Sequence, residues 1–184
     1  MADSWQTSRL LIRRFRESDW QDLHELQGDP DATRFVGGVW TPEKTREVTK
    51  RIAASYESKK LEWFAVADRT TDRVLGACWL GTLNPKWADA LNCGSQVELG
   101  YRFARRHWGQ SYATEAARAM LARGFNELAL SRTVAIVEVR NPASKRVLQK
   151  LGMKYVTYAQ RDGVRINYYV LEAGEVRLHA NSNE

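Results

Sequence analysis

The stretch from Glu98 to Glu115, ELGYRFARRHWGQSYATE, constrains the fold of this chain more than any other part of the sequence. A partly apolar, alternating run ends at a basic corner, and small residues then lead into the pattern of a first helical turn. Backbone N–H groups at a helix N-terminus have no partner within the helix and attract anions. The stretch therefore predicts a strand, a corner and a helix whose N-terminus faces a phosphate group.

The corner has a small residue at every second position, namely Gly109, Ser111 and Ala113. Small residues let consecutive backbone amides approach a ligand closely, and this geometry at the start of a helix suits a diphosphate. A plain strand-to-helix turn backed by an alanine-rich packing face explains the same residues, so this stretch alone leaves both interpretations open. The corner has neither the G-x-G-x-x-G pattern of dinucleotide-binding folds nor the G-K-[ST] of a P-loop.

The remaining patterns predict strands and helices around one core. Apolar alternation and turn residues indicate strands, whereas capping residues and helical spacing of apolar residues indicate helices. The predicted strands are 9–15, two within 63–83, 97–103, a run ending at Val139, and two within 154–171. The predicted helices run from Ser18 or Asp19 to about Gln27, from Pro42 to about Ser58, from Tyr112 to about Leu128 and from Pro142 to Leu151. Residues 84–95 are expected to form a loop. With 184 residues and no Gly/Pro/Ser-rich linker, we expect a single domain over residues 1–184 with a mixed α/β fold.

Composition argues against several classes of protein. The formal net charge is +6, but the 28 basic residues are spread along the chain beside 22 acidic ones. This distribution argues against direct nucleic-acid binding as the main function and favours an anionic cofactor or an acidic ribonucleoprotein neighbourhood. No apolar run reaches the roughly 20 residues of a membrane span, and the N-terminus lacks the regions of a secretory signal, so we expect a cytoplasmic protein. Cys78 and Cys93 suit neither a disulfide framework nor a metal site.

A second informative stretch is VRNPASKRVLQKLGM, residues 139–153. Asn141 leaves a strand and offers an amide donor and acceptor to a peptide-like ligand, while Pro142 starts a helix with Ser144 and Lys145 on its first turn. Asn141 as a simple N-cap and Ser144 as a solvated hydroxyl explain this stretch equally well. Taken with the corner, two strand ends that each lead into a helix would open toward one ligand.

The block VELGYRFARRHWGQSYATEAARAMLARGFNELALSRTVAIVEVRNPASKRVLQKLGM closely resembles the GNAT superfamily of acetyl-CoA-dependent N-acetyltransferases. Within it, the chain is similar to the Rim-type branch, the ribosomal-protein N-terminal acetyltransferases and their relatives. The opening TSRLLIRRFRESDW, the hairpin VADRTTDRVLGACWLG and the closing RDGVRINYYVL fit the same branch, so the resemblance covers nearly the whole chain. It implies a GNAT fold: a central mixed, mostly antiparallel seven-stranded sheet, splayed between strands 4 and 5 and flanked by about four helices.

The resemblance also implies where acetyl-CoA binds. The Trp108–Ala113 loop would bind the pyrophosphate through backbone N–H groups, and the Val97–Phe103 strand would pair with pantetheine along its exposed edge. Asn141 would contact the pantetheine arm, and Lys145 would reach the nucleotide phosphates. The full set of implied coenzyme-binding residues is Tyr101, Phe103, Trp108, Gly109, Gln110, Ser111, Tyr112, Ala113, Thr114, Asn141, Ser144 and Lys145.

Two positions depart from the superfamily pattern. Ser111 stands where glycine is usual; it adds a hydroxyl that can bond a phosphate oxygen, or a side chain that hinders close approach if the residue needs positive φ. Leu148 stands where many members have a tyrosine general acid, and a leucine cannot protonate a thiolate. By resemblance to the Rim-type enzymes, Ser144 lies near the coenzyme sulfur, where its hydroxyl would stabilise the thiolate or relay a water proton.

For deprotonation of the amine we consider three carboxylates: Glu98 on the splayed strand, Glu138 on the next strand and Asp162 in the last hairpin. Glu98 is the catalytic candidate beside Ser144, although a carboxylate near a strand end is more often solvated or ion-paired. None of the three histidines is placed for catalysis; they are His24 in the first helix, His107 in the basic corner and His179 in the tail.

These patterns predict an acetyl-CoA-dependent N-acetyltransferase that acts on a primary amine, with a protein N-terminal α-amine, such as that of a ribosomal protein, as acceptor. Two alternatives stay open: a small-molecule amine acceptor (a polyamine, amino acid or drug), and a catalytically silent acyl-CoA sensor. We expect residues 34–40 and 84–96 to line the acceptor site, with Trp40 and Trp87 either forming an apolar wall or packed in the core. We expect a monomer or homodimer, with no nucleic acid, membrane or metal as partner.

Overall fold

The computed structural model describes residues 4–57 and 63–175 of the chain. The chain forms two compact units, and two strands and one helix contribute residues to both. Unit 1 comprises residues 1–81 and 99–120, and unit 2 comprises residues 82–98 and 121–184. The expectation of a single domain over residues 1–184 stays a prediction.

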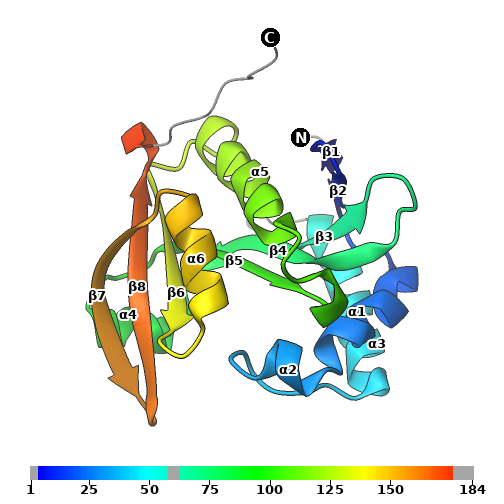
Figure 1. The fold of residues 1–184 in the computed structure, drawn as a ribbon, viewed down its shortest axis with the longest axis horizontal. Helices are drawn as coiled ribbons and strands as arrows, with labels where there is room; N and C mark the ends of the chain where they lie inside the picture. The colour runs from blue at the N-terminus through cyan, green and yellow to red at the C-terminus, as the bar shows by residue number, and fades with distance from the viewer. Residues whose placement is uncertain (1–3, 58–62, 176–184) are drawn as a thin grey trace. The chain divides into compact units, whose positions relative to one another are not determined.

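Unit 1 is built on antiparallel strands (Figure 1). They are β1 (Ser4–Gln6), β2 (Leu10–Arg13), β3 (Trp63–Asp68), β4 (Val74–Thr82) and, from residue 99 onward, β5 (Val97–Phe103). β2 pairs with both β1 and β3, and β3 pairs with β4, in each case antiparallel. Leu10 and Ile12 of β2 are completely buried, as alternate residues on the core face of a strand are expected to be.

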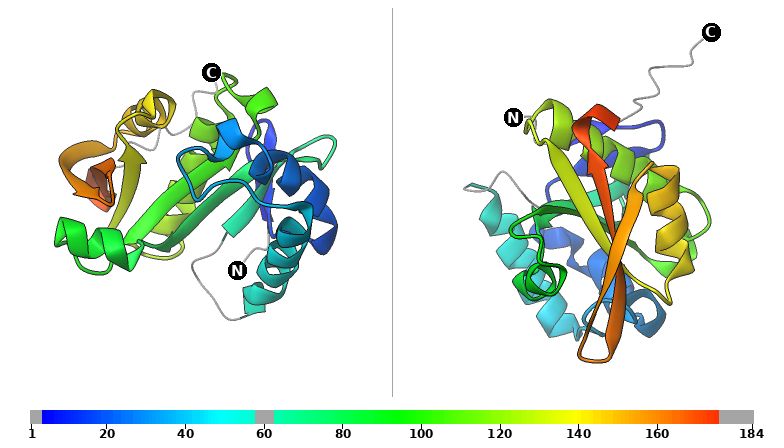
Figure 2. Two further views of the ribbon diagram at one scale, coloured as in Figure 1. Left: turned by 90° about the horizontal axis from the view of Figure 1, so that it is seen from below. Right: turned by 90° about the vertical axis from the view of Figure 1, so that its left-hand side faces the viewer.

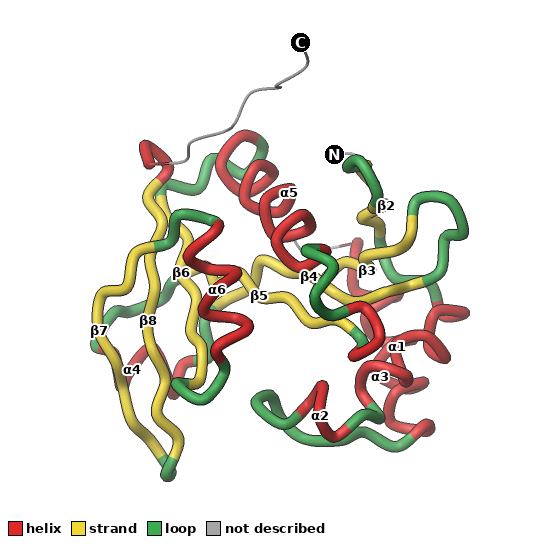
Figure 3. The backbone as a smooth tube through the Cα atoms, viewed as in Figure 1, coloured by secondary structure: helices red, strands yellow, loops and turns green. Residues whose placement is uncertain are grey.

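Three helices of unit 1 lie between β2 and β3 in the chain (Figure 3). They are α1 (Trp20–Gln27), α2 (Pro30–Thr33) and α3 (Pro42–Ala54). α3 begins as predicted, because the Thr41 hydroxyl oxygen accepts a hydrogen bond from the Lys44 N–H (3.2 Å). After Ala54 the chain makes a 3-10 turn over Ser55–Glu57, and the predicted helix end at Ser58 lies outside the described residues.

The core of unit 1 joins these helices to the sheet. Its buried cluster consists of Phe15, Leu23, Leu26, Tyr56, Ala65, Val74, Ala77 and Ala104. Leu23 and Leu26 are three residues apart on α1 and lie on one helical face, which is the spacing that an amphipathic helix needs.

Unit 2 contains an antiparallel three-stranded sheet in the order β6-β8-β7, with β7 and β8 forming a long hairpin (Figure 2). These strands are β6 (Arg132–Glu138), β7 (Lys154–Arg161) and β8 (Val164–Glu172). The hairpin turns at Asp162 (φ +50°) and Gly163 (φ +76°), which confirms the predicted Asp-Gly turn. The helices are α4 (Pro85–Leu91), α6 (Pro142–Lys150) and the second half of α5 (Tyr112–Asn126).

The hydrogen-bonded strand order is β1-β2-β3-β4-β5-β6-β8-β7, and the pairing of β5 with β6 is parallel. This is the predicted mixed, mostly antiparallel sheet, but it has eight strands where seven were expected. The additional strand is β1, which forms because the chain reverses at Thr7 and pairs residues 4–6 with β2. The predicted splay between the fourth and fifth expected strands stays a prediction.

Two helices were missed, and both begin with signals that the sequence contains. α4 occupies the segment expected to be a loop; Asn84 accepts a hydrogen bond from the Lys86 N–H (3.0 Å) and Pro85 follows it. α2 begins in the same way, with Asp29 accepting from the Asp31 N–H (2.8 Å). An N-cap followed by proline is the pattern that correctly predicted α3. Among the described residues, no helix has the length and apolar character needed to cross a membrane.

Candidate active site

The corner between β5 and α5 lies in unit 1 and has the conformation of an anion-binding loop. After a 3-10 turn at Arg105–His107, Gly109 and Ser111 both adopt positive φ, at +75° and +63°. The residues of this loop are exposed, and nothing lies within 4 Å of the position that a Cβ on Gly109 would take. The loop therefore requires left-handed backbone at two positions, and Ser111 meets that requirement with a side chain that disfavours it.

The first turn of α5 provides the donors. The helix makes its first backbone hydrogen bond from the Glu115 N–H to the Ser111 carbonyl (3.1 Å), so the preceding N–H groups of Tyr112, Ala113 and Thr114 have no acceptor within the helix. These donors stand beside an exposed loop, and the N-terminal end of the helix dipole favours negative charge there. The residues present fit a diphosphate.

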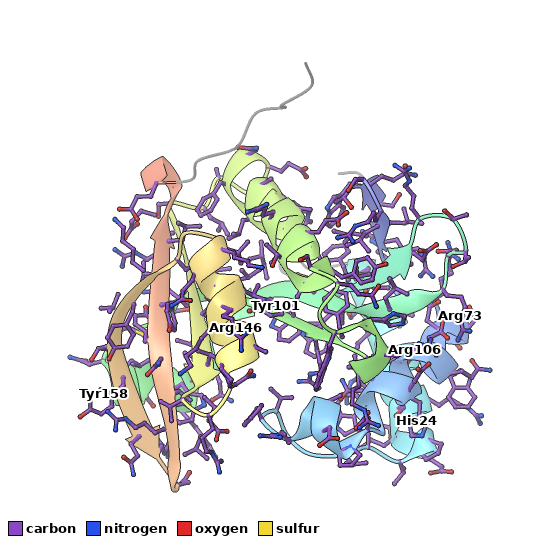
Figure 4. All side chains as sticks on the ribbon, viewed as in Figure 1. His24, Arg73, Tyr101, Arg106, Arg146 and Tyr158 are labelled. Carbon is purple, nitrogen blue, oxygen red and sulfur yellow. The ribbon has the colours of Figure 1, made fainter. Side chains whose placement is uncertain are left out.

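Aromatic residues of the corner are packed against each other and against the strand. Phe103 is buried, and its ring stacks on that of Tyr112 (6.5 Å between centroids). Trp108 is half exposed, and its indole N–H donates to the Phe103 carbonyl (2.8 Å). Tyr101, labelled in Figure 4, is partly buried on the same strand. Two residues of this strand were predicted to bind coenzyme. The Phe103 side chain is packed in the core, whereas the Tyr101 side chain is partly accessible.

A network centred on Glu115 fixes the corner to the turn between β1 and β2. Its carboxylate accepts hydrogen bonds from the hydroxyls of Thr7 and Ser8 (3.0 Å for Ser8) and pairs with the guanidinium of Arg9 (2.6 Å). Arg9 also donates to the Gln110 carbonyl inside the loop (3.0 Å). Burial alone would raise the pKa of Glu115, but these hydrogen bonds lower it below its ordinary value. No local sequence pattern predicts this network, because its residues lie about a hundred positions apart.

The basic corner is largely neutralised within unit 1. Arg105 pairs with Asp29 (3.2 Å) and Asp31 (3.0 Å), and Arg106, labelled in Figure 4, pairs with Glu25 of α1 (2.6 Å). The pKa of His107 is lowered by burial and, after that, by the charge of Arg106. These arginines hold α1 and α2, and the backbone donors of α5 remain the main attraction for a phosphate group.

Unit 2 contains the three candidate bases, and each lies in a different environment. Glu98 pairs with Val134 across the β5–β6 ladder, and burial raises the pKa of Glu98 to about 7. The carboxylate of Glu138 is bound by the guanidinium of Arg140. Asp162 lies in the β7–β8 turn with its side chain 84% exposed. A carboxylate with the raised pKa of Glu98 suits proton transfer near neutral pH.

Asn141 and Ser144 lie together in unit 2 at the start of α6. Asn141 accepts from the Ser144 N–H and donates through Nδ2 to the Ser144 hydroxyl oxygen, both at 3.1 Å. Asn141 is therefore the N-cap of α6, and its amide also orients the Ser144 hydroxyl. Lys145 is partly buried on the same turn, whereas Leu148 is only 2% exposed and belongs to the core.

The predicted site residues are divided between the two units. The residues 108–114 are brought together in unit 1, and Glu98, Asn141, Ser144 and Lys145 belong to unit 2. Trp40 of unit 1 is partly buried, with the Lys44 ammonium 5.2 Å from the centre of its ring, while Trp87 packs against the core cluster of unit 2. Within residues 4–57 and 63–175, no group of three or more His, Cys, Asp and Glu side chains is arranged to hold a metal ion.

Comparison with known proteins identifies the class. The family model described as "Acetyltransferase (GNAT) domain" matches residues 9–154, and the chain therefore belongs to the GNAT acetyltransferase family. The chain is 33% identical over 150 residues to the uncharacterized protein YkkB of Bacillus subtilis (strain 168), covering 81% of this chain and 84% of YkkB. It is 27% identical over 165 residues to the uncharacterized N-acetyltransferase YoaA of the same organism, covering 89% of this chain and 86% of YoaA.

Solved structures agree with this assignment. The crystal structure of a GNAT-family acetyltransferase from Bacillus anthracis has a TM-score of 0.79 and 27% identity, and the match covers 94% of this chain and 99% of that chain. The protein is thus an acetyltransferase enzyme that uses acetyl-CoA. These matches establish the family but do not single out the Rim-type branch within it.

Proposed function

We propose that this enzyme is a Rim-type N-acetyltransferase that acetylates the α-amine at the N-terminus of a protein, with Glu98 as the base. The observation that carries the proposal is the environment of Glu98, whose pKa is raised by burial to about 7. A carboxylate with this pKa is substantially ionised at neutral pH and is a stronger base than an exposed one. Burial thus prepares Glu98 to take a proton from an ammonium group.

Proton transfer to Glu98 is also less costly from an α-ammonium group than from an alkyl ammonium group. An α-ammonium group has a pKa of about 8, so proton transfer to Glu98 is uphill by about one unit, or about 1.4 kcal/mol. A lysine-like or polyamine ammonium has a pKa of about 10.4, which makes the same transfer uphill by more than three units, or about 4.6 kcal/mol. The difference supports a protein N-terminus as acceptor and disfavours a polyamine.

The other residues bind and orient. The N–H groups of the first turn of α5 would hold the pyrophosphate of acetyl-CoA, which supplies an activated acetyl thioester when bound. The hydroxyl of Ser144, oriented by Asn141, would donate a hydrogen bond to the developing sulfur anion. Leu148 cannot take this role, since its side chain has no proton to give and lies in the core.

Calorimetric titration with acetyl-CoA tests the proposal, followed by thiol-release assays in the same preparation with N-terminal peptides and small amines. Coenzyme binding with peptide-dependent thiol release is the expected result. Release with polyamines or drugs but with no peptide would replace the protein N-terminus by a small-molecule acceptor. Binding without release from any amine would point instead to an acyl-CoA sensor.

A further inference from the structure

Arg9, in the turn between β1 and β2, contacts the corner between β5 and α5 at three points within unit 1. Its Nη1 donates a hydrogen bond to the Gln110 carbonyl (3.0 Å). Its Nε and Nη2 both bind Oε2 of Glu115, at 2.8 and 2.6 Å. Its guanidinium carbon lies 4.5 Å from the centre of the Tyr112 ring. One side chain therefore holds the loop, the first residue of α5 and the carboxylate on the first turn of that helix.

The guanidinium of Arg9 is itself held in a fixed orientation. Oε1 of Glu115 accepts hydrogen bonds from the Arg9 backbone N–H and from the Ser8 hydroxyl, both at 3.0 Å. Glu115 thus binds both the main chain and the side chain of Arg9. The carboxylate also offsets the positive charge, which reduces the direct attraction of Arg9 for a second anion. The contribution of Arg9 to the corner is therefore mainly one of geometry.

The hydrogen bond to Gln110 fixes the orientation of the peptide group between Gln110 and Ser111. This peptide is trans, and in a trans peptide the C=O and the N–H point in opposite directions. Because Arg9 binds the carbonyl, the Ser111 N–H points away from Arg9. Ser111 is exposed, and no acceptor for its N–H is found among residues 4–57 and 63–175. The Ser111 N–H is thus a fixed donor that directly precedes the donors of the first turn of α5.

The backbone on both sides of this peptide needs support. Gly109 and Ser111 have φ values of +75° and +63°. A residue with a Cβ persists in the left-handed region only where its surroundings hold it there. Arg9 acts on the carbonyl between these two residues, and the Glu115 N–H binds the Ser111 carbonyl (3.1 Å). Arg9 therefore supports the strained backbone from outside the loop.

We infer that Arg9 is a positioning residue for the coenzyme: it holds the peptide between Gln110 and Ser111 so that the Ser111 N–H donates to the coenzyme diphosphate. Arg9 acts through the loop backbone and not through its own contact with a phosphate group. A donor that is oriented in advance binds more tightly, because less conformational entropy is lost on binding. The inference rests on the proposed binding of the pyrophosphate at this loop and is independent of the amine acceptor.

Titration calorimetry with three ligands tests the inference. Coenzyme A and dephospho-coenzyme A both carry the diphosphate, whereas pantetheine lacks the diphosphate and the nucleotide. In Arg9→Gln, the Kd of the first two ligands should rise by the same factor, at least about 10-fold, because a hydrogen bond to a charged group is lost. The affinity for pantetheine should not change. Arg9→Lys keeps the charge but lacks the planar fork, so it should weaken the same two ligands almost as much.

Arg132→Gln is the matched control. The side chains of Arg9 and Arg132 are both 46% exposed, and Nε and Nη2 of Arg132 likewise bind a single carboxylate oxygen, that of Glu172 in unit 2. The affinities for all three ligands should be unchanged in Arg132→Gln. Thermal unfolding of each variant measures its folded fraction at the temperature of the titration. An Arg9→Gln protein that is less stable but keeps the wild-type ratio of coenzyme to pantetheine affinity would make Arg9 only a structural residue.

Two further outcomes would overturn the inference. A fall in affinity confined to coenzyme A would assign Arg9 to direct contact with the 3′-phosphate, which is the group that dephospho-coenzyme A lacks. Full recovery of affinity in Arg9→Lys would show that charge acts without the fixed geometry. The proposed pyrophosphate site would fail in a different way, since the wild-type protein would then bind dephospho-coenzyme A no more tightly than pantetheine.

Discussion

The backbone of Ser111 is strained in the folded protein, and replacement of this residue by glycine should raise the stability of the protein. Ser111 has φ +63°, a left-handed conformation that costs a residue with a Cβ roughly 1–2 kcal/mol. Glycine avoids this cost but loses about 0.5–1 kcal/mol more backbone entropy on folding. The net expectation for Ser111→Gly is a gain of about 0.5–1 kcal/mol in the free energy of unfolding. For a chain of this size, the melting temperature should then rise by roughly 1–4 °C.

Urea denaturation and thermal unfolding of matched variants measure this gain. Ser111→Ala keeps the Cβ and should show no such gain, whereas Ala129→Gly, at a residue with φ +51°, should repeat the gain at a site outside the loop. Ala119→Gly, inside α5, should instead lose about 1 kcal/mol. Affinity for acetyl-CoA, from titration calorimetry, should be equal or tighter in Ser111→Gly. A destabilised Ser111→Gly would refute the reasoning on backbone strain. Coenzyme binding that is at least tenfold weaker in this variant would instead make the Ser111 hydroxyl a phosphate ligand.

Three further substitutions test the remaining roles. Glu98→Gln should lower kcat/KM by about 10²–10⁴-fold. The wild-type rate should decline below about pH 7, where Glu98 takes up its proton, and the variant should not show this decline. A variant pH–rate profile that keeps the decline would exclude Glu98 as the base. The same variant should gain stability over the wild type as pH rises toward about 7, since a raised carboxyl pKa in the folded state costs stability once the unfolded group ionises. Ser144→Ala should lower the rate of single-turnover thiol release more than coenzyme affinity, and an unchanged rate would remove Ser144 from the mechanism. Glu115→Gln should destabilise the protein at neutral pH, because the lowered pKa of the Glu115 carboxyl stabilises the folded state at pH values above the pKa of the unfolded chain. This contribution is lost as pH falls through the folded-state pKa, so urea titrations should show the stability difference between variant and wild type shrinking on acidification. A stability difference independent of pH would contradict the hydrogen-bonded role of Glu115.

Local signals predicted the elements of the site well. The alternation of residues 97–103, the small residues of the corner and the Asn141-Pro142 cap all have their cause within a few residues. The same kind of signal is present at Asn84-Pro85 and Asp29-Pro30, where helices form that were not predicted. At both places an N-cap residue followed by proline begins the helix, as Thr41-Pro42 begins α3.

The sequence by itself determined the mixed α/β class and the positions of most strands and helices, because capping, turn formation and alternation act between near neighbours. The roles of the individual site residues stay predictions. Tertiary structure alone decided which charges are perturbed and which are neutralised. Burial, which raises the pKa of Glu98, and the pairing of Thr7 and Arg9 with Glu115 depend on segments distant in the chain. Desolvation and charge pairing are properties of the packed chain, and no local pattern encodes them.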